Sequence, residues 1–153
     1  MPSVHVLRPN AQERGASLTE VLMVMVILAL VAALAGPSYK AAIARAQARS
    51  VAAEIASGLR LTRQLAMSRR ERLLVQFDQA RRALTFMRAD SGDVLDEYQY
   101  ADKGVMLDVP SAGPNVLFYP SGRSATATTI AIVDHMGRRI TLTVSITGRV
   151  SLS

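Results

Sequence analysis

A run of twenty residues, 16–35, constrains the fold of this chain more than any other feature. The stretch from Val21 to Ala35 contains no polar side-chain atom, and only two hydroxyl side chains and Glu20 interrupt the run before it. A helix of about 20 residues crosses the ~30 Å hydrocarbon core of a bilayer. Because the segment is apolar on every side, it has no face suited to water. The rest of a 153-residue chain offers little to bury it, so we predict a membrane-spanning helix rather than a core helix.

A cleaved secretory signal peptide is the alternative interpretation. Ala33-Leu34-Ala35 has the small-residue form of a signal peptidase site. Glu20 stands at the head of the apolar region and Pro37 closely follows the hypothetical cut, and both are atypical of such a peptide. Helix-forming sequence also continues beyond that point, which favours the membrane anchor. The count of Lys and Arg on the two sides of the run does not set its orientation.

Residues 39–68 predict a second helical stretch. They are rich in alanine, and larger apolar residues recur every three or four positions, namely Ile43, Val51, Ile55, Leu59 and Leu65/Ala66. A proline inside a helix removes one N–H and clashes with the preceding turn. We therefore expect one long helix that bends at Pro37, with a second half whose apolar face packs on other structure.

The C-terminal half predicts antiparallel β-structure. Short apolar or β-branched runs separated by turn residues indicate strands at 73–77, 83–87, 105–109, 116–119, 129–133, 140–146 and 149–152. The acidic stretch 90–104 has two glycines and few aliphatic residues, and we predict a loop there. The expected fold class is α+β, a long N-terminal helical spine packed on a C-terminal antiparallel β-sheet. The expected divisions are a leader (1–15), a transmembrane helix (16–36), its amphipathic continuation (37–70) and a β-sheet domain (71–153).

Composition argues against a catalytic or metal-binding protein. The chain has no Cys and two His, which excludes a disulfide scaffold and a Cys-based zinc site. No serine lies in a nucleophile elbow. The acidic segment near Asp90 offers oxygen donors for Ca²⁺ but lacks the spacing of an EF-hand loop. We predict no enzymatic activity, no cofactor and no metal.

The residues around the apolar run form an unusual constellation. A carboxylate within a membrane helix is costly and needs a partner. If the chain were cut after Gly15, the new α-amino group of Ala16 would lie one helical turn from Glu20 and could pair with it in the same or a neighbouring copy. Pro37 and Tyr39 follow at the other end of the run.

The segment Arg14-Gly-Ala-Ser-Leu-Thr-Glu-Val-Leu22, with the apolar run after it, resembles the prepilin signal of type IV pilins and pseudopilins. This resemblance implies cleavage between Gly15 and Ala16 by a prepilin peptidase/methyltransferase, with N-methylation of Ala16. It also implies that Glu20 serves assembly, and that Pro37 and Tyr39 match the kink proline and the tyrosine after it.

Later segments resemble the minor pseudopilin H/FimT group, namely 45–77, Val116-Leu-Phe-Tyr-Pro-Ser-Gly-Arg123 and 140–150. The resemblance implies a pilin-like fold and a minor pseudopilin near the tip of a type II secretion pseudopilus, which drives export of folded proteins across the outer membrane. The implied partners are other major and minor pseudopilins and the inner membrane, which the chain crosses once with its C-terminal domain in the periplasm.

The FimT branch of the same group gives the alternative function, a minor type IV pilin that binds DNA for natural transformation. Members of this branch tend to carry two arginines in a Gly-Arg-x-Arg tail. The corresponding segment here, Gly148-Arg-Val-Ser151, lacks the second arginine. Under this reading the candidate DNA-binding residues are Arg69, Arg70, Arg72, Arg81, Arg82 and Arg149. No aromatic platform interleaves with these arginines, although stacking on single-stranded bases would favour one.

The formal net charge of +6 is unevenly distributed. Residues 40–89 carry eleven basic and three acidic side chains, whereas residues 90–108 carry six acidic side chains and one lysine. We expect the basic segment of one subunit to face the acidic segment of another.

Overall fold

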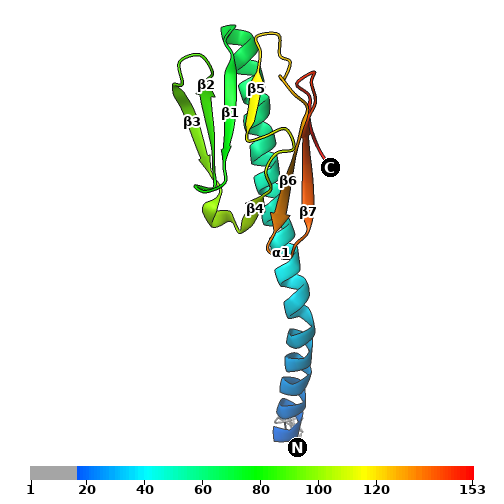
Figure 1. Cartoon of the computed structure of the whole chain (residues 1–153). Helices are drawn as coiled ribbons and strands as arrows, with labels where there is room; N and C mark the ends of the chain where they lie inside the picture. The colour runs from blue at the N-terminus through cyan, green and yellow to red at the C-terminus, as the bar shows by residue number, and fades with distance from the viewer. Residues whose placement is uncertain (1–16) are drawn as a thin grey trace, which may run out of the picture. The chain divides into compact units, whose positions relative to one another are not determined.

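The computed structural model describes residues 17–153, apart from the side chains of residues 34–37. One α-helix, α1 (Leu18–Arg69), precedes eight strands (Figure 1). The helix ends in a Schellman-type cap, in which Arg70 adopts a left-handed φ of 55° and the Glu71 amide donates to the Ala66 carbonyl oxygen over 3.3 Å. The long helix predicted for this region is confirmed.

The described chain forms two compact units, one ending at Ser38 and one spanning Tyr39–Ser153. In the first unit, the apolar side chains of residues 18–33 are exposed on all sides of α1. This segment is apolar and long enough to cross a membrane. Its exposed apolar side chains are as expected of a segment whose surroundings are lipid or other subunits.

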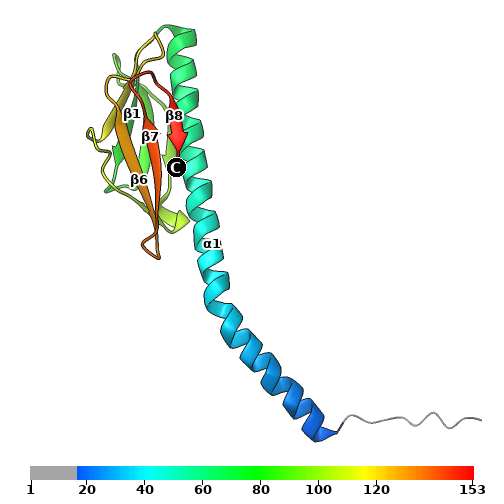
Figure 2. The same ribbon diagram turned by 90° about the vertical axis from the view of Figure 1, so that its right-hand side faces the viewer.

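In the second unit, a stripe of α1 residues forms one wall of the core, namely Ala44, Ala48, Val51, Ala52, Ile55, Ala56, Leu59 and Ala66. Their spacing of three or four places them on one face of the helix. The predicted stripe was wrong at its first member, because Ile43 is exposed and Ala44 faces the core instead. The small alanines let the strands pack close to the helix, and Figure 2 shows the strands on one side of this part of α1.

The β-structure consists of two four-stranded antiparallel sheets, where a single sheet was expected. The first has the order β3-β2-β1-β5, with β1 (Leu73–Asp78), β2 (Ala83–Arg88), β3 (Val94–Gln99) and β5 (Asn115–Phe118). The second has the order β4-β6-β7-β8, with β4 (Val105–Leu107), β6 (Thr128–Asp134), β7 (Arg139–Val144) and β8 (Val150–Leu152). Both sheets contribute alternate side chains to one core with α1.

Strand β3 lies where the sequence predicted a loop. It pairs with β2 from Ala83↔Gln99 to Met87↔Val94, with a register irregularity near Phe86. As an edge strand it is mostly exposed, and only Leu95 and Tyr98 pack against the core. A strand that buries so little has no need of aliphatic residues, and its charges protect the open edge from further pairing. The short helix η1 (Ala101–Lys103) follows it.

Candidate assembly and binding surfaces

Glu20 lies in the first turn of α1, within the apolar surface of residues 18–33. The helix begins with hydrogen bonds from the amides of Glu20 and Val21 to the Ser17 carbonyl oxygen, over 2.9 and 3.1 Å. The Glu20 side chain is exposed, so the surface offers one carboxylate surrounded by hydrocarbon. The predicted cleavage residues Gly15 and Ala16 lie outside the described residues, and the pairing of Glu20 with an α-amino group stays a prediction.

Pro37 lies within α1, which runs from Leu18 to Arg69. The predicted bend at this residue stays a prediction. Tyr39, which begins the second unit, is 69% exposed. Its ring is therefore available to a neighbouring molecule rather than to the core of its own subunit.

The arginines proposed for DNA binding do not share one surface. Arg69 ends α1, Arg70 follows it in the cap, and Arg72 precedes β1. Arg81 and Arg82 lie in the turn at the other end of β1, about 20 Å away for a six-residue strand. Two of these five arginines also pair within the chain. Arg72 pairs with Asp90, and Arg81 pairs with Glu97 over 3.5 Å.

Arg149 lies apart from all of them, beside two arginines that the sequence analysis did not single out. Arg63 Nε donates to the Gly122 carbonyl oxygen over 2.8 Å, and Arg60 Nη2 donates to the Val150 carbonyl oxygen over 3.1 Å. These contacts hold the turn after β5 and the start of β8 against α1. Arg60, Arg63 and Arg149 line a shared polar cleft. The sequence shows Arg60 and Arg63 three residues apart in the predicted helix. It does not show that the chain around Arg149 folds back against that helix.

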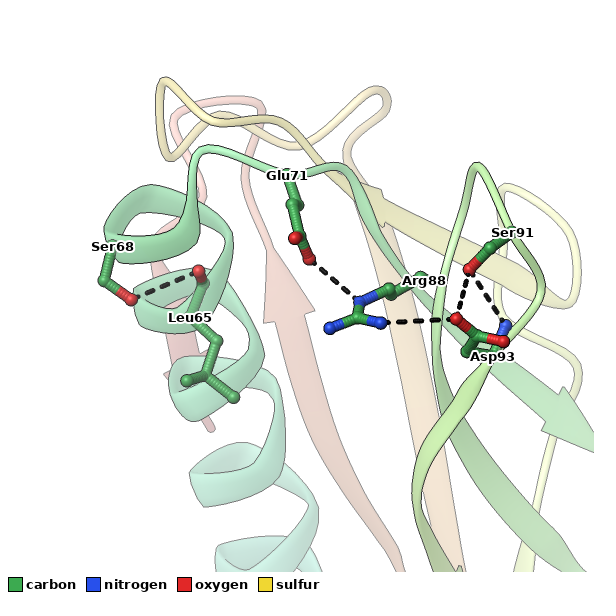
Figure 3. Close-up of polar contacts among 6 residues, drawn as sticks. All are labelled: Leu65, Ser68, Glu71, Arg88, Ser91 and Asp93. Atoms are coloured by element: carbon green, nitrogen blue, oxygen red, sulfur yellow. Dashed lines mark hydrogen bonds and ion pairs between the residues drawn. The ribbon is translucent and has the colours of Figure 1, made fainter.

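The acidic segment 90–108 is paired mainly within its own chain. Arg88 donates from Nε to Glu71 over 3.0 Å and from Nη1 to Asp93 over 3.2 Å (Figure 3). The hydrogen bond from Ser91, and then Arg88, lowers the pKa of Asp93. Of the six acidic residues in the segment, four form intrachain ion pairs, namely Asp90, Asp93, Glu97 and Asp108. Little of this charge remains for the expected contact with another subunit. Three of the carboxylates considered as Ca²⁺ ligands, those of Asp90, Asp93 and Glu97, pair with arginines instead.

A polar cluster attaches β3 and η1 to the helix. The hydroxyl of Tyr98 and the ammonium of Lys103 each donate to Glu54 Oε2 over 2.6 Å. Lys103 Nζ also lies 4.9 Å from the centre of the Tyr98 ring. Hydrogen bonds from Lys103 and then Tyr98 lower the pKa of Glu54, while burial and the bond to Glu54 raise the pKa of Tyr98 to about 12.

A second polar cluster lies where β6 turns into β7. Asp134 continues the inward alternation of β6 and is buried. Its carboxylate accepts from the amides of Met136 and Arg138, and from Arg138 Nε over 2.9 Å. The hydrogen bond from the backbone amide of Arg138 is the main reason that the pKa of Asp134 is lowered. Arg138 Nη2 then donates to the Ala41 carbonyl oxygen over 2.8 Å, which ties the turn to α1.

Comparison with known families and structures gives two kinds of match. Residues 51–148 match the family model described as "Type II transport protein GspH", and residues 10–36 match the "Prokaryotic N-terminal methylation motif". A search of curated proteins found no match.

Two solved structures share the fold. The type IV minor pilin FimU of Pseudomonas aeruginosa has 23% identity and a TM-score of 0.62, and the alignment covers 71% of this chain and 90% of FimU. The minor pseudopilin EpsH of Vibrio cholerae has 21% identity and a TM-score of 0.59, with 70% of this chain and 96% of EpsH covered. The expected α+β pilin-like fold is confirmed by both.

Proposed function

Because the chain belongs to the GspH family of type II transport proteins, whose members are pilin-like structural subunits, we propose that it is a minor pseudopilin of a type II secretion system. In this role it assembles near the tip of the periplasmic pseudopilus that drives export of folded proteins across the outer membrane. The observation that carries the proposal is the family match over residues 51–148. The methylation motif over residues 10–36 supports membrane anchoring and processing.

The proposed divisions of the chain follow from this role. Residues 1–15 are the leader, 16–36 the transmembrane helix, 37–70 its continuation and 71–153 the periplasmic domain. Prepilin peptidase cuts between Gly15 and Ala16 and methylates Ala16. The chain then crosses the inner membrane once, and its function is structural rather than catalytic.

Assembly in this proposal uses the exposed apolar surface of α1. Packing against other major and minor pseudopilins replaces lipid around residues 18–33, and Glu20 pairs with the N-terminal amine of Ala16 in a neighbour. A carboxylate in hydrocarbon is stabilised strongly by such a partner. Pro37 and Tyr39 shape the junction between the domain and the helical segment that other subunits bury in the fibre.

Intact mass of the chain isolated from membranes tests the processing step. We expect the mass of a chain that begins at N-methylated Ala16. A mass that includes residues 1–15, or one that fits a cut after Ala35, would contradict the proposal.

Assembly and export are tested by Glu20→Gln, with Glu97→Gln in the exposed β3 as the matched control. We expect Glu20→Gln to insert into the membrane normally but to reduce cross-linking to other pseudopilins at least tenfold, and to reduce secretion.

Normal secretion in a strain lacking the gene would exclude the secretion role.

The DNA-binding alternative has one structural observation in its favour, the cleft that Arg60, Arg63 and Arg149 share. Phosphate contacts need such charge, and each lost contact lowers the salt dependence of binding by about one unit. A gel shift with the full chain in non-ionic detergent separates the two functions. Under the secretion proposal no useful affinity is expected. If DNA binds, and Arg149→Gln weakens it more than Arg81→Gln does, the alternative is correct.

A further inference from the structure

A methionine near the C-terminal end of α1 packs against a glycine turn. Met67 is 37% exposed, so a small molecule in solvent can reach part of its side chain. Its thioether also contacts Gly122, which lies in the turn after β5 and has a left-handed φ of 77°. A Cβ placed on Gly122 would lie 2.5 Å from Met67 Sδ and 3.2 Å from Met67 Cγ. The sulfur therefore packs on the glycine backbone with no space for a further atom between them.

Arg63 lies one helical turn before Met67 and binds the same turn. Its Nε donates to the Gly122 carbonyl oxygen over 2.8 Å. Gly148, in the turn between β7 and β8, lies against both groups, because a Cβ there would overlap the Gly122 carbonyl oxygen and lie 2.7 Å from Arg63 Nε. The amide of each glycine also closes its own turn with a hydrogen bond of 2.8 Å. All these contacts lie within the second unit and join α1 to two turns.

We propose that Met67 is a site of reversible oxidation, and that its sulfoxide releases the Gly122 turn from α1. In the reaction with hydrogen peroxide, a lone pair of Met67 Sδ attacks one peroxide oxygen. The S–O bond forms as the O–O bond breaks, and the proton of the attacked oxygen passes to the leaving hydroxide, which departs as water. The sulfur loses two electrons and the peroxide gains them. A methionine sulfoxide reductase reverses the change.

The sulfoxide does not suit the place that the thioether fills. Oxidation makes an apolar side chain larger and polar, and it adds a hydrogen-bond acceptor to a contact that has no donor for it. Arg63, on the same helix face as Met67, can donate to the new oxygen. When it does so, the Gly122 carbonyl oxygen loses its partner. The turn after β5 then loses its hydrogen bond to α1 together with the sulfur contact, and the Gly148 turn loses the surface on which it packs.

Oxidation of the full-length chain in non-ionic detergent tests the proposal. Hydrogen peroxide is the oxidant, peptide mass spectrometry measures the sulfoxide at each methionine, and amide hydrogen exchange is followed in the peptides that contain Gly122 and Gly148. We expect conversion of Met67 to accelerate exchange in both peptides by about tenfold, the effect of one lost hydrogen bond. Treatment with methionine sulfoxide reductases should restore the original exchange.

Three variants assign the effect to one sulfur. Met67→Leu keeps a similar apolar volume but cannot form a sulfoxide, so peroxide should leave exchange in both turns unchanged. Met106→Leu is the matched control, because Met106 points away from the core of β4 and is 61% exposed. Peroxide should accelerate exchange in this variant as much as in the wild type. Met67→Gln places a polar group near the sulfoxide position and should accelerate exchange without peroxide.

Three results would overturn the proposal. Met67 could stay reduced after Met106 is fully converted, or be fully converted while exchange in both turns stays unchanged. Peroxide could also accelerate exchange in Met67→Leu as in the wild type, which would assign the effect to another methionine. If Met67→Leu loosens the turns by itself, the reductase result on the wild type decides. Exchange that stays fast after Met67 is reduced again would show irreversible damage in place of a reversible site.

Discussion

The guanidinium of Arg138 reaches the backbone carbonyl oxygen of Ala41, 97 residues earlier in the chain, through a hydrogen bond of 2.8 Å. The same side chain is held by Asp134, whose carboxylate also accepts two amides of the β6–β7 turn. A turn, a buried carboxylate and the first residues of the domain helix therefore form one connected polar unit.

Arg138→Gln should loosen the β6–β7 turn without unfolding the domain. Loss of the guanidinium leaves Asp134 without its cationic partner and breaks the contact with α1. We expect amide hydrogen exchange at residues 135–138 to accelerate by roughly tenfold or more. Arg139→Gln is the matched control, because its ion pair with Asp108 is exposed and long. Equal protection in both variants would refute the connection.

Leu59→Ala should destabilise the domain much more than Leu61→Ala. Leu59 is fully buried in the core, whereas Leu61 on the same helix is 54% exposed. Deleting a buried leucine side chain typically costs about 2–5 kcal/mol, and an exposed one under about 1 kcal/mol. Urea unfolding of the full chain in non-ionic detergent measures the difference. Similar free energies of unfolding for the two variants would place the core elsewhere.

Gly148→Ala and Gly137→Ala separate backbone strain from steric overlap. Both glycines have a left-handed φ, of 76° and 77°, which costs a residue with a side chain about 1–2 kcal/mol. A Cβ at Gly148 would also overlap the Gly122 carbonyl oxygen, while nothing lies within 4 Å of one at Gly137. The Gly148 variant should therefore have the lower melting temperature, and it should disturb the position of Arg63, which lies against the same spot. Equal melting temperatures would contradict this packing.

Acid should weaken the attachment of β3 to α1 through Glu54. Because hydrogen bonds from Lys103 and Tyr98 depress its pKa in the folded state, Glu54 stabilises folding above its ordinary value of 4.5. That contribution is lost as the pH falls through the lower folded value. The group is exposed, so solvent screening limits the effect to under about 1 kcal/mol. Glu54→Gln should reduce stability at pH 7 and flatten its fall between pH 5 and pH 3, as followed by urea unfolding. An unchanged acid profile would contradict the prediction.

The predicted elements that were confirmed are those with a strong burial pattern. The alternation of Leu73, Val75 and Phe77 places β1 directly, because these residues face the core and the residues between them do not. Strand β3 has no such alternation, since its edge position buries little, and its backbone pairing with β2 is invisible in its residue types. The division into two sheets likewise depends on pairing between distant strands.

The binding surfaces were predictable only where they are local in sequence. Glu20 within the apolar segment is evident from the chain alone, because its cost in hydrocarbon does not depend on the fold. The grouping of Arg149 with Arg60 depends on a contact across 90 residues, from Arg60 to Val150. The charge pattern of the sequence was incomplete for a related reason. It located the basic and acidic segments correctly, but it did not show that four of the six acidic residues of 90–108 pair within their own chain.

The core of the domain begins at Ala44, and none of its members lies among residues 18–33. Neighbouring helices can therefore replace lipid acyl chains around that helical segment without the loss of any core contact. In the proposed assembly, the free-energy cost of leaving the bilayer falls on the first unit alone. We therefore expect the free energy of unfolding of the folded domain to be the same before and after that transfer.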